Sequence, residues 1–174
     1  VLPKPTAVWG ELVDRPEYLA EHSWVTLKQT LTGFGLTVAL GTLIGTVVAA
    51  SRLVNKMFSP WLVALNAVPK VALAPLRVVW LGFGMESRVA MVTLMCFFPI
   101  VLATTTGLTS TPSELSELAR SLDAPTWRTF IRVRFPHALP QIFVGLKVAM
   151  PLAVVGSVIG EFRGNDGLGQ VITV

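Results

Sequence analysis

Residues 29–51 read QTLTGFGLTVALGTLIGTVVAAS, an unbroken run without a charged side chain between Lys28 and Arg52. The hydrocarbon core of a bilayer is about 30 Å thick, and about 20 helical residues are needed to cross it. Within lipid, only a helix or a closed barrel satisfies the hydrogen bonds of the backbone. This stretch is therefore predicted to be a membrane-spanning helix, and the fold class to be all-α.

Three more segments are apolar over a similar length, namely residues 58–83, 89–108 and 138–160. The first of these carries Lys70, Arg77 and three prolines, and the last carries Lys147 and Pro151. Proline removes a helical hydrogen bond and clashes with the preceding turn, so both segments are expected to be kinked or broken. The prediction is a polytopic membrane helix bundle with four spans, in one transmembrane domain over residues 1–174.

The composition also indicates lipid as the solvent of this chain. Hydrophobic residues make up 52% of the 174 residues, charged residues only 14%, and the mean hydropathy is +0.65. The net charge of +4 is scattered among apolar runs and forms no basic stripe with interleaved aromatic residues, which argues against nucleic acid as a partner. The single cysteine, Cys96, excludes a disulfide within the chain, and no metal site is predicted.

Small residues recur at a spacing of four in two of the predicted spans. Gly41 and Gly45 form one such pair, and Gly156 and Gly160 form the other. In lipid, this spacing lets helix backbones approach closely. The spans are therefore expected to pack as a bundle, and they could also pack against a second copy of the chain.

The basic residues between the predicted spans indicate the orientation, because loops rich in Lys and Arg stay in the cytoplasm. Six of them follow the first and third spans: Arg52, Lys56, Arg120, Arg128, Arg132 and Arg134. The opposite flanks are residues 1–24, the turn at 84–88 and the tail after Gly160, which together hold fewer basic residues. We expect these flanks outside the cytoplasm.

Residues 109–136 are too polar to span a membrane and are predicted to form a cytoplasmic helical hairpin. Thr111, Pro112 and Glu114 have the spacing of a capped helix start. The apolar residues that follow recur at helical spacing: Leu115, Leu118, Ala119 and Leu122. One amphipathic helix is therefore predicted from about Ser113 onward.

A second helix is predicted after Asp123, with its end near Phe135 and Pro136. Its apolar side is expected to contain Trp127, Phe130 and Ile131, and its polar side Arg128 and Arg132. By pattern alone, a hairpin of this kind either lies on the membrane surface or docks into the groove of a partner.

The loop resembles the EAA loop of ATP-binding-cassette (ABC) importer permeases. The pattern of that loop is Glu-Ala-Ala, three residues, Gly, nine residues, Ile, one residue and Leu-Pro. The residues at the same spacing here are Glu117, Leu118, Ala119, Asp123, Val133, Phe135 and Pro136. Leu118 and Asp123 depart from the pattern, and aspartate adopts the left-handed turn of a glycine less readily.

The resemblance extends over nearly the whole chain and is strongest to the nitrate, sulfonate and taurine branch of these permeases. The similar stretches are residues 68–76, 80–84, 97–100, 138–147, 160–162 and 167–169. Permeases of this MetI-like kind usually have six spans. This chain would supply the second to the fifth of them, so it resembles a fragment.

The resemblance implies a multi-pass subunit of the bacterial inner membrane that forms a substrate path and binds no cofactor of its own. The chain has no Gly-x-x-x-x-Gly-Lys-Ser/Thr phosphate loop and no expected catalytic residue, so a cytoplasmic ABC ATPase would bind and hydrolyse the ATP. An extracytoplasmic substrate-binding protein, membrane lipid and a second permease, identical or homologous, would be further partners. The implied coupling residues are Glu114, Leu115, Glu117, Leu118, Ala119, Arg120, Leu122 and Asp123.

The charged residues of the second span are candidates for the substrate path. Charges at bilayer depth are costly and usually face protein or a water-filled cavity. Lys70 and Arg77 lie seven residues apart and would favour a small anionic or vitamin-precursor-like solute of the nitrate, sulfonate or taurine type. Alternatively, each snorkels to an interface, as expected for Lys147, or pairs structurally.

Functions of other classes are weighed against the importer permease. A secondary transporter or channel would show the same hydropathy but would not need the hairpin. A non-transporting scaffold fits if the outer helices are absent from the protein. A membrane enzyme is not indicated, because the spans contain no paired carboxylates, metal-ligand cluster or nucleophile with a base.

Overall fold

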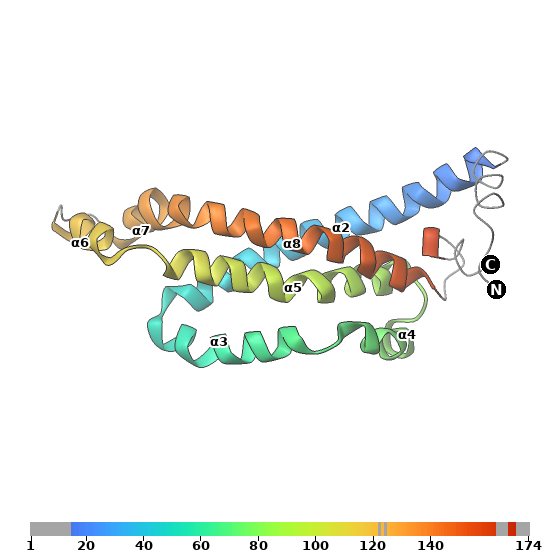
Figure 1. The fold of residues 1–174 in the computed structure, drawn as a ribbon, viewed down its shortest axis with the longest axis horizontal. Coiled ribbons are helices and arrows are strands. Elements are labelled where there is room, and N and C mark those ends of the chain that lie inside the picture. Colours follow the sequence, from blue (N-terminus) through green and yellow to red (C-terminus); the bar gives the residue numbers. More distant parts are fainter. Residues whose placement is uncertain (1–14, 122, 124, 163–166, 170–174) are drawn as a thin grey trace.

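The computed structural model describes residues 15–121, 123, 125–162 and 167–169, and for residues 113, 116, 118 and 120 it describes the backbone alone. Within these ranges the chain forms helices and turns and no strand, which confirms the all-α prediction (Figure 1). The elements are α2 (Pro16–Ala50), α3 (Arg52–Ala67), η1 (Lys70–Leu73), α4 (Ala74–Leu81), α5 (Met85–Thr109), α6 (Ser113–Ser121), α7 (Thr126–Thr129), η2 (Phe130–Arg134) and α8 (Phe135–Glu161).

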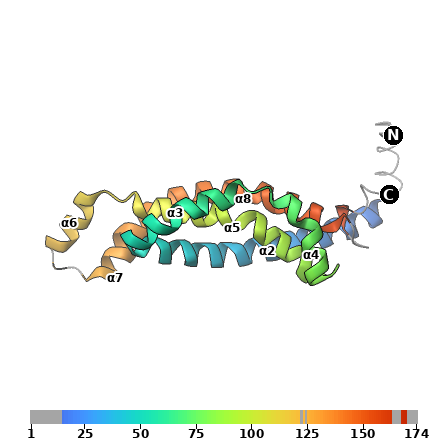
Figure 2. The ribbon, with the colours of Figure 1, turned by 90° about the horizontal axis from the view of Figure 1, so that it is seen from below.

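Helix α5 is the centre of the bundle. Helices α2 and α8 pack along one side of it and touch each other, and α3 and α4 run along its other side (Figures 1 and 2). The largest buried cluster joins α5 to α8, with Met91, Cys96 and Ile100 packed against Ala149 and Ala153. The core is therefore built around one helix that contacts both layers.

Three helical stretches are long and apolar enough to cross a membrane: Pro16–Ala50, Met85–Thr109 and Thr126–Glu161. Helix α3 with η1 and α4 forms a fourth candidate, bent by 78° at the break between Ala67 and Lys70. Val68 and Pro69 are extended there. Proline lacks an N–H group and disfavours the helical conformation of the residue before it, so the expected break in the second span falls at Pro69.

The segment around Pro136 corrects one prediction. The second hairpin helix was expected to end near Phe135 and Pro136, but α7 continues through η2 into α8 without a break. Helix η2 is a π-helical turn that closes with a hydrogen bond from the Phe135 N–H to the Phe130 carbonyl. Pro136 directly follows this π-helical turn, where the regular i→i−4 hydrogen bonds are already interrupted, so the helix passes the proline without ending. Further along, α8 continues through Pro140 and Pro151, so the fourth span is not broken at these prolines.

The glycine pairs lie at close contacts between helices, as predicted. A Cβ atom on Gly41 would lie 2.8 Å from Ile100 Cγ2, and one on Gly45 would lie 2.7 Å from Thr104 Cβ. Gly156 and Gly160 of α8 face α5 in the same way. All four glycines therefore hold α2 and α8 against α5, while packing against a second copy stays a prediction.

The buried face of α2 is the less apolar one. Its buried positions are mostly Thr and Gly: Thr26, Gln29, Thr30, Gly33, Thr37, Gly41, Gly45, Val48 and Ala49. Leucines such as Leu36, Leu40 and Leu43 are exposed instead. Lipid solvates leucine as well as a protein core does, so small residues take the helix contacts.

Candidate functional site

A buried carboxylate lies at the end of the bundle opposite the hairpin. Glu161 ends α8 and has no exposed surface. Its side chain accepts hydrogen bonds from Thr26 Oγ1 at 2.7 Å, from Gln29 Nε2 and from the Gly169 N–H at 2.7 Å. Gln29 Nε2 also donates to Ser157 Oγ at 3.0 Å. A buried carboxylate is costly unless donors surround it, and this one has three donors, two from α2 and one from Gly169.

Residues 167–169 are held over this carboxylate by their backbone. The Gly167 N–H donates to His22 Nδ1 at 2.8 Å, and the Leu168 N–H donates to Thr26 Oγ1 at 3.0 Å. Gly167 has a φ of 100°, and a Cβ atom there would clash with the carboxylate of Glu161. Glycine is therefore required at this position both by conformation and by space.

Two arginines converge on the last turn of α8 from α4 and α5. Arg77 Nη2 donates to the Gly160 carbonyl at 3.1 Å, and the backbone and Cβ of Arg88 lie against Gly160. The two guanidinium groups are close enough to interact electrostatically, and within the described residues neither has a carboxylate partner. The carbonyl end of a helix carries partial negative charge, which favours cations here.

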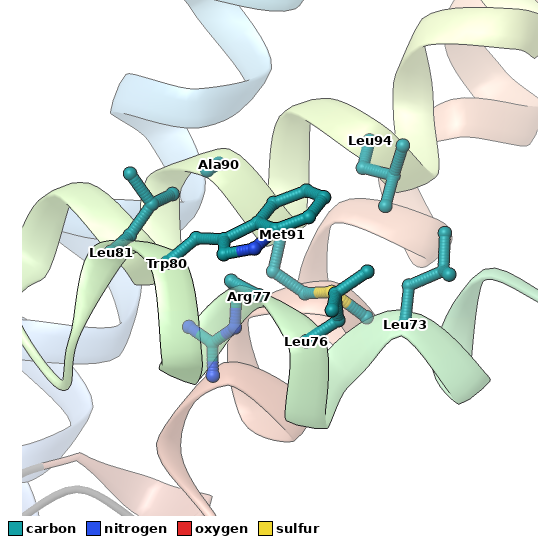
Figure 3. A pocket seen from close by; sticks show the side chains of 8 residues that line it. All are labelled: Leu73, Leu76, Arg77, Trp80, Leu81, Ala90, Met91 and Leu94. Atoms are coloured by element: carbon teal, nitrogen blue, oxygen red, sulfur yellow. The ribbon is translucent and has the colours of Figure 1, made fainter.

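Arg77 also borders a pocket between α4 and α5 with a volume of about 280 Å³. The other lining residues are Leu73, Leu76, Trp80, Leu81, Ala90, Met91 and Leu94. Figure 3 shows the guanidinium group directed away from the leucine side chains and toward α8. The pocket therefore offers an apolar wall with one cation at its edge.

Lys70 lies at the break of the second span and has a different environment. Its Nζ donates to the carbonyl and to the side chain of Asn66, at 2.8 and 3.1 Å, and lies 5.3 Å from the ring centre of Phe98. It is not among the residues that line the pocket beside Arg77. The structure thus does not bring the two predicted substrate-path residues into one pocket.

At the end of the bundle opposite Glu161, α6 and α7 extend beyond the packed ends of α5 and α8 (Figure 1). The side chains of Glu114, Leu115 and Glu117 are exposed on α6, whereas Ala119 is buried. Leu118 and Arg120 lie on the same helix, and Leu122 lies outside the described residues. Three of the predicted coupling residues on α6 are thus accessible from outside the molecule, and Asp123, which follows this helix, is exposed as well.

Asp123 has a φ of 49°, the only positive φ of a residue other than glycine in the described part of the chain. This residue occupies the position at which the EAA pattern has glycine. Aspartate is one of the few residues that visit the left-handed region. The turn thus has the left-handed conformation that the glycine of the pattern would favour.

The apolar side predicted for the second hairpin helix is divided in the structure. Phe130 packs against the cluster of Ala49, Leu108, Ala138 and Ile142 at the end of the bundle. Trp127 and Ile131 are exposed, at 61% and 55% of their surface. The hairpin thus presents two large apolar side chains outward.

The Glu161 cluster was not recognised from the sequence. Glu161 lies just after the fourth predicted span, and Thr26 and Gln29 lie before the start of the first predicted span or at its edge. One available signal was the polar spacing of Thr26, Gln29, Thr30 and Thr37 on one face of α2. Polar residues repeated on one face of a membrane helix face protein rather than lipid.

The fold matches that of a known transporter. A chain from the inward-facing MetNI methionine ABC transporter superposes with a TM-score of 0.74, covering 97% of this chain and 81% of that chain at 20% identity. The bundle of α2 to α8 thus has the fold of an importer permease.

The sequence comparison is more specific. This chain belongs to the family of binding-protein-dependent transport system inner membrane components, whose sequence pattern matches residues 38–174. It is a multi-pass permease subunit of an ABC importer.

Named relatives come from several bacteria. A probable ABC transporter permease of Haemophilus influenzae is 35% identical over 99% of this chain and 71% of its own length. The formylaminopyrimidine transport permease ThiX of Halalkalibacterium halodurans is 37% identical over 97% and 68%, and the riboflavin transport system permease RibX of Chloroflexus aurantiacus is 36% identical over 100% and 66%. The names of these relatives thus refer to different solutes.

Proposed function

We propose that the α6–α7 hairpin, residues 113–129, is the docking element for a cytoplasmic ABC ATPase, with the helix from Ser113 to Leu122 as the coupling helix. The observation that carries this proposal is its projection beyond the bundle, with Glu114, Leu115 and Glu117 exposed (Figure 1). An amphipathic helix of this kind fits a groove on a partner protein.

The hairpin also has the chemistry of a contact surface. Trp127 and Leu115 are exposed apolar side chains, and the Arg128 guanidinium lies 5.6 Å from the ring centre of Trp127. Exposed apolar groups rimmed by charges are typical of surfaces that bind a partner. Glu117 and Arg120 would supply polar contacts, and Asp123 would set the turn.

Transport would then follow from a shift between two populated conformations. ATP binding would close a pair of ATPase subunits, and the docked hairpins would move with them. Because α7 continues without a break through η2 into α8, movement of the hairpin would be transmitted directly to a membrane span. A second permease, identical or homologous, and an extracytoplasmic substrate-binding protein would complete the transporter.

The proposed solute is small and either anionic or related to a vitamin precursor. Two relatives are named for formylaminopyrimidine and riboflavin transport, and a third, from Bacillus subtilis, is named for aliphatic sulfonates. The guanidinium group of Arg77, beside a largely apolar pocket, supports a solute with a negative group and an apolar body. Lys70 would act at a separate point of the path, at the break of the second span.

The docking proposal is tested by copurification of the ATPase with the permease. We expect Glu117→Arg to lower the recovered ATPase by roughly tenfold or more, because it reverses a charge at the contact. Glu86→Arg is the matched control, since it makes the same exchange at an exposed site on the opposite end of α5. Equal recovery from both variants would contradict the docking site and favour a hairpin lying on the membrane.

The solute proposal is tested by uptake into vesicles containing the assembled transporter. Arg77→Gln is expected to raise the KM for an anionic solute while leaving uptake of a neutral solute unchanged. Lys147→Gln, at an exposed position of α8, is the control. An equal loss for both solutes would assign Arg77 to packing against Gly160 instead.

A further inference from the structure

A second pocket, of about 360 Å³, lies between α2 and the start of α5, apart from the pocket beside Arg77. Its wall includes the cations Lys28 and Arg88, the amide of Gln29, and the aromatic rings of Trp24 and Phe83. The transport mechanism proposed above does not use these residues. Their combination of two cations and two aromatic rings calls for a separate explanation.

Two buried polar atoms of this wall lack a hydrogen-bond partner among the described residues: Arg88 Nε, a donor, and Gln29 Oε1, an acceptor. Both side chains are almost fully buried, with 6% and 1% of their surfaces exposed. Leaving such atoms without a partner destabilises a protein. Each atom is therefore expected to meet a ligand.

The orientation of the Gln29 amide follows from its other contacts. Its Nε2 atom donates to the carboxylate of Glu161 and to Ser157 Oγ. An ionised carboxylate only accepts hydrogen bonds, so the nitrogen must face Glu161 and the oxygen must face away from it. Gln29 thus offers an acceptor, and Gln29 and Arg88 line the same pocket.

The depth of this pocket corresponds to a headgroup layer. Helix α2 rises about 33 Å between Lys28 and Ala50, at about 1.5 Å per residue. The hydrocarbon core is about 30 Å thick, so Lys28 lies at the outer headgroups when Ala50 lies at the cytoplasmic side. Trp24 and Phe83 are 66% and 55% exposed at this level, where aromatic side chains are enriched in membrane proteins.

We propose that this pocket binds the headgroup of an anionic phospholipid. Arg88 and Lys28 hold the phosphate, and Gln29 Oε1 accepts a hydrogen bond from a hydroxyl of the headgroup. Trp24 and Phe83 flank the glycerol and the first part of the acyl chains. The expected ligand is a lipid with both a phosphate charge and a headgroup hydroxyl, such as phosphatidylglycerol.

Native mass spectrometry of the purified protein tests this binding with lipids of identical acyl chains. The wild type is expected to retain one phosphatidylglycerol in preference to phosphatidylcholine. Phosphatidylmethanol has the charge but no headgroup hydroxyl, and the wild type is expected to bind it more weakly than phosphatidylglycerol. Arg88→Gln and Lys28→Gln are each expected to weaken phosphatidylglycerol binding roughly tenfold. Lys56→Gln, which removes an exposed cation near the cytoplasmic end, is the control and should leave it unchanged.

Three outcomes would overturn the proposal. The first is equal retention of phosphatidylglycerol and phosphatidylcholine by the wild type. The second is unchanged phosphatidylglycerol binding in Lys28→Gln. Lys28 is exposed, so this variant is expected to fold. If Arg88→Gln does not fold, the result for Lys28→Gln decides alone. The third is displacement of the lipid by inorganic phosphate, with inorganic phosphate raising the thermal stability of the protein as much as phosphatidylglycerol does. That outcome would assign the pocket to a free oxyanion.

Discussion

The side-chain amide of Gln29 donates to the carboxylate of Glu161, and this hydrogen bond joins α2 to the last turn of α8 across 132 positions of the chain. Thr26 and Gly169 donate to the same carboxylate, so three donors surround one buried acid. A polar cluster thus joins α2, the end of α8 and Gly169 at the end of the bundle opposite the hairpin.

Replacing Glu161 by glutamine tests the strength of this cluster. Glu161→Gln puts an N–H₂ group where a carboxylate oxygen accepted a hydrogen bond, so at least one donor loses its partner. The expected loss of stability is about 1–3 kcal/mol, the cost of a buried unsatisfied group. It is measured by unfolding of the detergent-solubilised protein.

Glu86→Gln is the control for this change, because Glu86 is exposed at the start of α5. If Glu161→Gln and Glu86→Gln unfold at the same temperature, the carboxylate of Glu161 does not hold the outer end together.

A second prediction concerns the contact between α2 and α5 at Gly41. The Gly41→Leu change places a side chain where a Cβ atom alone would lie 2.8 Å from Ile100 Cγ2. Overpacking of this kind costs about 1–3 kcal/mol. Stability is followed by titration with a denaturing detergent.

Gly35→Leu provides the matched control on the same helix, because no atom lies within 4 Å of a Cβ at Gly35. Its stability should stay at or above that of the wild type, since leucine forms helix more readily than glycine. Adding Ile100→Ala to Gly41→Leu should recover part of the loss. Equal effects at Gly41 and Gly35 would refute the close contact.

A third prediction concerns the left-handed turn at Asp123. Asp123→Gly should stabilise the hairpin by about 0.5–1 kcal/mol, because glycine adopts a φ of 49° without strain. Asp123→Val should destabilise it, because a β-branched residue is strongly disfavoured there. Hydrogen exchange of the amides of α6 reports both effects, and identical exchange in all three proteins would mean that this turn is not constrained.

A fourth prediction tests the orientation in the membrane. In a Cys96→Ala background, Glu117→Cys on α6 should react with an impermeant maleimide only from the cytoplasmic side. Glu86→Cys should react only from outside, because the 25 residues of α5 between these regions are about 37 Å long. Labelling of both cysteines from the same side would rule out α5 as a span.

Several features of this protein follow from short stretches of sequence. The uncharged run after Lys28 predicts a spanning helix, and Pro69 predicts the break at which the second span bends by 78°. The glycine pair at 41 and 45 predicts a close helix contact. A single stretch of sequence is enough to reveal these features because they depend on local properties. These are the hydropathy of the stretch, the missing N–H of proline and the missing side chain of glycine.

The tertiary structure decides which residues meet. Helices in lipid have no strongly apolar face that marks their buried side. The polar spacing on α2 indicates that Thr37 faces protein while Leu40 is exposed, but it does not reveal which helix Thr37 meets. Nor does it reveal that Gln29 reaches Glu161, since that contact depends on how α2 and α8 cross α5. The sequence by itself determines the spanning helices and the break at Pro69, while the polar cluster and the pocket at the end opposite the hairpin come from packing between distant helices.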